Sequence, residues 1–123
     1  MFENKILVCV TGQLQCARLI RRGRELADAQ RADLLVLHVR TRQKTLMGSP
    51  DITAALNQLY AEARGADAEM EIIASPEVEK TISAYARDVR ADTLVIGRSP
   101  SDARPPMSER LAPRLPDIEI IVV

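Results

Sequence analysis

The sequence predicts an α/β fold in which helices cover both faces of a parallel β-sheet. Short apolar runs alternate along the chain with segments of helical period, and this alternation is typical of parallel strands joined by helical crossovers. The run at residues 6–10, the turn Thr11-Gly12-Gln13 and an amphipathic segment form the first such unit. The polar turns Arg31-Ala32-Asp33 and Arg90-Ala91-Asp92 have the same sequence, and each precedes a later apolar run. We therefore expect a single domain over residues 1–123.

The composition excludes several classes of function. The chain has 123 residues, of which 46% are hydrophobic, so one core of ordinary size is expected. Its 17 basic and 17 acidic side chains cancel and only 2% of its residues are aromatic, which argues against a nucleic-acid partner. We expect a cytoplasmic protein without a membrane segment, because no apolar stretch approaches the length of a span. Two cysteines, Cys9 and Cys16, are too few for a disulfide framework or a zinc site, and no metal is expected.

The first helix follows the turn, and its apolar stripe is expected to face the sheet. The stripe consists of Cys16, Leu19, Ile20, Gly23, Leu26 and Ala27. Gly23 lowers helix propensity by about 1 kcal/mol relative to alanine, so we expect it to allow a close approach of helix to sheet. The arginines of this segment alternate with acids and are interpreted as a solvated surface.

The middle of the chain repeats the pattern. Residues 34–39 form a second apolar run, and its histidine, His38, is interpreted as a core residue at the strand end. A helix is expected over residues 51–64 with Asp51 as N-cap. The third run, residues 68–73, alternates acidic and apolar residues and is therefore an edge strand with one face in solvent.

The last third supplies the remaining elements. Ser75-Pro76-Glu77 predicts a helix start with a serine cap and a proline at the first helical position. A fourth strand follows at residues 93–96, then a proline-rich loop and a brief helix that Pro113 limits. The final run, residues 118–123, is a fifth strand. An apolar strand at a sheet edge needs a cover, and we expect homodimerisation through Ile118, Ile120 and Val122.

Five parallel strands with helical crossovers make a Rossmann-like three-layer sandwich, and the details resemble the universal stress protein family. The resemblance rests on residues 5–12, 32–39, 91–97 and 108–111. Within that family, residues 9–12, 19–22 and 97–99 look closest to the universal-stress domain of bacterial potassium-sensing histidine kinases. The resemblance implies strand order 3-2-1-4-5, a pocket between strands one and four, and a dimer through strand five.

The resemblance also implies a ligand, and the loop residues predict that its pocket is degenerate. ATP-binding members carry an aspartate after the first strand, where this chain has Thr11, and a glycine-rich phosphate loop after the fourth. Gly97 matches the first glycine of that loop, but Pro100 stands at the second and the later Gly-Ser pair is missing. A proline cannot offer the backbone N–H that would hold a phosphate oxygen. The first hypothesis is therefore a regulatory or interaction module that works through protein partners.

The second hypothesis is an adenine-nucleotide sensor. Its ligand would be ATP, AMP or a cyclic dinucleotide, with the backbone at Val39 reading the adenine and Arg98 the phosphates. The expected walls of the pocket are Thr11, Gly12, Gln13, Val39, Gly97, Arg98 and Ser99. Some kinase-borne relatives bind a cyclic dinucleotide through Ser-Gly-Ser and a tyrosine, for which this chain has Thr11-Gly12-Gln13 and His38. No catalytic residue is expected, because no nucleophile motif or dinucleotide fingerprint is present; slow ATP hydrolysis, as in some family members, is the third hypothesis.

Overall fold

The computed structural model of the protein describes residues 4–10, 17–40, 50–98 and 105–123, and within the range 50–55 it describes the backbone alone. These residues form one sheet of parallel strands in the order β3-β2-β1-β4-β5. The predicted fold class and strand order are therefore confirmed. The strands are β1 (Asn4–Val10), β2 (Ala32–Arg40), β3 (Glu69–Ala74), β4 (Thr93–Ile96) and β5 (Glu119–Val122). The helices are α1 (Ala17–Gln30), α3 (Pro50–Gly65), α4 (Val78–Asp88), α5 (Met107–Leu111) and the 3-10 turn η2 (Ala112–Arg114).

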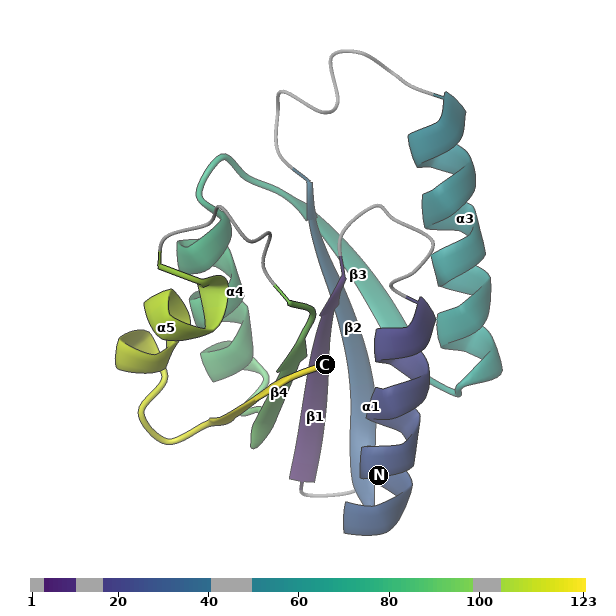
Figure 1. The fold of residues 1–123 in the computed structure, drawn as a ribbon. Coiled ribbons are helices and arrows are strands. Elements are labelled where there is room, and N and C mark those ends of the chain that lie inside the picture. The colour runs from purple at the N-terminus through teal and green to yellow at the C-terminus, as the bar shows by residue number, and fades with distance from the viewer. Residues whose placement is uncertain (1–3, 11–16, 41–49, 99–104) are drawn as a thin grey trace.

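The helices form a layer on each face of the sheet. Figure 1 shows α1 and α3 together on one face, and α4 and α5 on the other. Because side chains of a strand alternate between its two faces, each central strand contributes to both layers. In β1, Ile6 and Val8 belong to the core under α1 and α3, whereas Leu7 belongs to the core under α4 and α5.

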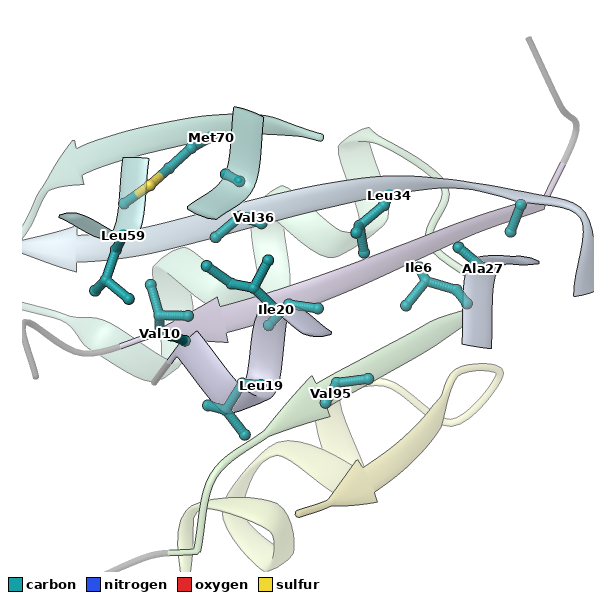
Figure 2. Close-up of a cluster of buried hydrophobic side chains, with 14 residues drawn as sticks. Ile6, Val10, Leu19, Ile20, Ala27, Leu34, Val36, Leu59, Met70 and Val95 are labelled. Atoms are coloured by element: carbon teal, nitrogen blue, oxygen red, sulfur yellow. The ribbon is translucent and has the colours of Figure 1, made fainter. Parts of the chain in front are cut away.

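The larger core fills the space between the sheet and the pair α1 and α3. Figure 2 shows Ile20 of α1 beside Val36 of β2, and Met70 of β3 pointing toward Leu59 of α3. Ile20, Val36 and Leu59 have no exposed surface. This packing fixes α1 across β1 and β2, and so it fixes the point at which α1 begins next to the carboxyl end of β1.

α1 approaches the sheet closely at Gly23, as the sequence predicted. A Cβ atom at Gly23 would lie 2.5 Å from Cγ2 of Val8 and 2.9 Å from Cδ1 of Leu34. Both distances are shorter than carbon atoms tolerate, so only glycine fits this helix position without a shift of its neighbours.

The amino-terminal edge of the sheet is tied together at Asp92. Its backbone N–H donates to the carbonyl of Lys5 at 2.8 Å, and its carboxylate Oδ2 accepts the N–H of Lys5 at 2.8 Å. Its own carbonyl accepts the N–H of Glu119 at 3.1 Å. One residue therefore joins the beginnings of β1, β4 and β5.

The turns from α1 to β2, from α3 to β3 and from α4 to β4 each contain a residue in the left-handed conformation. Arg31, Asp67 and Arg90 have φ values of 52°, 55° and 59°. After α4, the N–H of Ala91 donates to the carbonyl of Ala86, and after α3 the N–H of Ala68 donates to Ala63, which is the hydrogen-bond pattern of a Schellman cap. The left-handed residue precedes an alanine in each turn, so Asp67 is the counterpart of Arg31 and Arg90.

Two predicted helix starts differ from the observed ones. α3 begins at Pro50, so Asp51 lies inside the helix instead of capping it. α4 begins at Val78 with Glu77 as N-cap, and Pro76 precedes the helix. Ser75 still accepts a hydrogen bond, from the N–H of Glu77 at 3.1 Å. Its hydroxyl therefore closes the turn at Pro76 and not the first helical turn, because α4 begins two residues later than the sequence pattern predicted.

Candidate functional site

The carboxyl ends of β1, β2 and β4 form the edge at which a ligand is expected. The chain leaves β1 toward β2 and β3 on one side and toward β4 and β5 on the other, so the strand order reverses between β1 and β4. Parallel sheets bind ligands at such a reversal. The β1–β4 register pairs Val8 with Val95, which puts Val10 and Gly97 at the same level two residues further on. Val10 also pairs with His38 of β2.

His38 is the polar side chain that the described part of this edge buries. Its ring is 6% exposed, and Nδ1 lies 3.0 Å from the carbonyl oxygen of Val10. Because a carbonyl only accepts, Nδ1 carries the proton in this bond. The bond holds the end of β1 against β2 directly before the turn Thr11-Gly12-Gln13. The core position predicted for His38 is confirmed, and the bond to Val10 is a feature that the sequence pattern did not reveal.

The remaining described site residues lie on both sides of His38. Val39, the next residue of β2, is half-buried against the core under α4 and α5. Gly97 follows β4 and is half-buried, and a Cβ atom there would meet Cδ1 of Leu19 at 3.4 Å. Arg98 is exposed. Val39, Gly97 and Arg98 thus lie at the carboxyl ends of β2 and β4, and their role as walls of a ligand pocket stays a prediction.

Four of the predicted pocket residues lie outside the described residues. They are Thr11, Gly12, Gln13 and Ser99. Cys16 and Pro100 also lie there, so the predicted cradle between the turn after β1 and the loop after β4 stays a prediction.

The thiol of Cys9 is unreactive at neutral pH. Cys9 keeps some exposed surface as a residue, but desolvation of the thiol raises its pKa from 9.0 to about 12. A thiol with that pKa is protonated at neutral pH and is a poor nucleophile. Cys9 lies one residue before Val10, so the cysteine near the expected ligand-binding end of β1 is unreactive.

An ion pair joins α5 to α4. The guanidinium of Arg110 contacts the carboxylate of Glu79, and Arg110 also donates to Sδ of Met107 at 3.8 Å. Its Nε atom is buried without a hydrogen-bond partner among the described residues. The spacing of α5 gave no signal for this contact, which depends on the packing of two helices that are distant in sequence.

The described residues hold no group of three or more His, Cys, Asp or Glu side chains that could bind a metal ion. None of the helices in the same part of the chain has the length and hydropathy needed to cross a membrane.

The universal stress protein family matches residues 3–111 of this chain. The chain belongs to the universal stress protein family. The identified relationship agrees with the resemblance seen in the residues of β1, β2 and β4.

Among curated relatives, this universal stress protein is similar to the sensor protein KdpD of two Mycobacterium tuberculosis strains. The identity is 30% over 97 residues, which are 79% of this chain. The chain spans only 11% of the length of those sensors.

Solved universal stress proteins share the fold. One in complex with cAMP superposes with a TM-score of 0.74 at 22% identity, covering 98% of this chain and 95% of the other. The Archaeoglobus fulgidus protein in complex with dAMP gives 0.70 at 20% identity, covering 99% and 98%. A family member from Burkholderia pseudomallei gives 0.70 at 17% identity, covering 98% and 95%.

Proposed function

We propose that this universal stress protein is a regulatory and interaction module, without catalytic activity, whose crevice between β1 and β4 does not hold a triphosphate tightly. The observation that carries the proposal is Pro100, which stands where a phosphate-binding loop needs a glycine N–H. Arg98 is then a described cation directly after β4 that can meet an anion. The inert thiol of Cys9 supports a role without covalent chemistry.

A second candidate, an adenine-monophosphate sensor, is favoured by the ligands of two structural relatives. The relatives described above were solved with cAMP and with dAMP. Each of these ligands carries a single phosphate group, which needs fewer backbone donors than a triphosphate does. One arginine at the end of β4 could therefore serve such a ligand even though Pro100 interrupts the loop.

The proposed module is a homodimer through β5, and it acts in the cytoplasm. β5 lies at one end of the sheet, and no described strand pairs with its outer side. Val122 is 45% exposed there, while Ile118 and Ile120 are half-buried. A two-fold pairing of β5 strands would cover this apolar edge.

Calorimetry with ATP, AMP, cAMP and cyclic di-AMP tests the crevice. We expect no micromolar binding of ATP to the wild-type protein. If AMP or cAMP binds, Arg98→Ala should weaken it by about tenfold or more, which is the size of one lost charge-assisted hydrogen bond. Arg22→Ala is the matched control, because the ion pair of Arg22 with Glu25 lies on the exposed surface of α1. Micromolar ATP binding that Arg98→Ala abolishes would overturn the proposal, and monophosphate binding that depends on Arg98 would establish the second candidate.

The mass in solution, recorded with the same samples, tests the dimer. Val122→Lys should convert a wild-type dimer to monomers, because it places a charge on each copy in the apolar contact. Ile72→Lys on β3, the opposite edge, serves as the control and should leave the dimer intact. A monomeric wild-type protein at the concentration of the experiment would refute the dimer.

A further inference from the structure

The outer edge of β3 forms an open groove with α3. The groove has a volume of about 750 Å³ and is lined by β3 and by the last two turns of α3. β3 is the end strand of the sheet and pairs only with β2 among the described strands. Alternate backbone N–H and C=O groups of an end strand point away from the sheet, so this groove contains a row of unused hydrogen-bonding groups.

One side of the groove is apolar. Tyr60 of α3 is 46% exposed and Ile72 of β3 is 39% exposed, and the only other large hydrophobic side chain with comparable exposure in the described residues is Val122 on β5. Tyr60 and Ile72 line this groove, above the buried side chain of Met70. Two exposed apolar groups that meet in one groove can bury an aliphatic side chain between them.

The opposite side of the same strand is acidic. Glu69 and Glu71 are exposed, and they alternate with Met70 and Ile72 so that they face the α4 side of the sheet. Glu71 accepts a hydrogen bond from the hydroxyl of Tyr85 at 3.3 Å, which orients its carboxylate. Along β3, side chains therefore alternate between apolar groups on the α3 face of the sheet and carboxylates on the α4 face.

We propose that the β3 edge is a docking site for an extended peptide segment that alternates basic and apolar residues and adds to the sheet as a further strand. Backbone hydrogen bonds to β3 hold such a segment, and its side chains sort by face. Basic side chains lie opposite Glu69 and Glu71, and apolar side chains enter the groove between Tyr60 and Ile72. Arg64 lines the groove from the last turn of α3, which keeps basic residues of the segment away from the apolar side.

A second copy of this chain is a poorer match for this edge than a basic segment is. If two β3 strands paired antiparallel about Met70, Glu69 of one copy would stand opposite Glu71 of the other, twice in each pair. Like charges directly opposite one another destabilise a strand pair. The acids thus disfavour this register of self-pairing at β3, while the apolar β5 edge has no comparable row of charges.

The test is a titration of the isotope-labelled protein with a short capped peptide that alternates lysine and valine, followed through backbone amide chemical shifts. The amides of Glu69–Ala74 should shift, and the affinity should fall as salt is added. The matched peptide with glutamate in place of lysine should bind at least about threefold more weakly, given the size of cross-strand charge pairs. Glu69→Lys leaves one acid and one base on this face, so it should remove most of the difference between the two peptides, which a purely structural role of Glu69 would not do.

Two further variants locate the contact. Tyr60→Ser should weaken both peptides alike, and Val122→Ser, at the other edge, should weaken neither. Equal affinity of the wild-type protein for the two peptides, shifts centred on β5, or an undiminished difference between the peptides in the folded Glu69→Lys protein would each overturn the proposal. Concentration-dependent shifts of β3 amides in the protein alone would also overturn it, because they would show a second copy as the occupant.

Discussion

Replacement of Gly23 by alanine tests the contact that holds α1 against the sheet. The added methyl carbon would lie 2.5 Å from Cγ2 of Val8 and 2.9 Å from Cδ1 of Leu34. Leu34 can move the end of its flexible side chain at small cost. Val8 is fully buried in the central strand and β-branched, so its χ1 rotation is restricted and the methyl group must displace the helix or the strand.

Two opposing terms decide the result. Alanine in place of glycine in a helix stabilises it by about 1 kcal/mol. Overpacking a tight core costs about 1–3 kcal/mol, and the shorter of the two contacts places this site in the upper part of that range. We therefore expect Gly23→Ala to lower the free energy of unfolding by about 1–2 kcal/mol.

Urea unfolding followed by circular dichroism measures this change, and Gly65→Ala is its matched control. Gly65 is also helical, but a Cβ atom there would meet nothing within 4 Å, so the same substitution should stabilise the protein by about 0.5–1 kcal/mol. Val8→Ala in the Gly23→Ala background should recover part of the loss relative to the sum of the single changes. If Gly23→Ala stabilises the protein as Gly65→Ala does, the reasoning about close approach is wrong.

Two other predictions concern the turn after α4 and the thiol of β1. Arg90 has a φ of 59°, so Arg90→Gly should raise the free energy of unfolding by about 1 kcal/mol. As a control, Ala84→Gly within α4 should lower it by a similar amount. An Arg90→Gly protein that is less stable than wild type in the same urea assay would contradict the strain at this residue. Because the thiol of Cys9 has a pKa of about 12 in the folded protein against 9.0 for the free group, the unfolded chain loses that proton first, and stability should fall as the pH rises from about 9 toward 12. Tyr85, whose pKa burial raises from 10.0 to about 12, adds to this decline, so the comparison is between wild type and Cys9→Ala: a decline equally steep in both would show that the thiol contributes nothing.

The sheet could be predicted because its strands are short apolar runs whose neighbours follow from topology. β4, Thr93–Ile96, is buried along its whole length, as a short continuous apolar run in a parallel sheet predicts. The edge position of β3 followed from its alternating acids, and Gly23 from its place in an apolar stripe. These features depend on residues that are near in sequence.

The features that could not be predicted depend on contacts between distant elements. The bond from His38 to Val10 joins two strands through a backbone carbonyl that any residue could supply. The groove at β3 is lined by Tyr60 of α3 together with Ile72, and no spacing in the sequence encodes that placement. The start of α4 was predicted too early because Ser75 can cap either a helix or a short turn, and the conformation of Pro76 decides between them.

The bonds around Asp92 have a consequence for how this protein can diversify. They join β1, β4 and β5 at the end of the sheet away from the expected ligand, through two backbone groups and one short carboxylate. Substitutions, insertions or grafted loops at the carboxyl edge leave these bonds intact, so residues such as Arg98 are free to change without unfolding the sheet. The carboxyl ends of the strands can thus change in sequence while the sheet itself is kept.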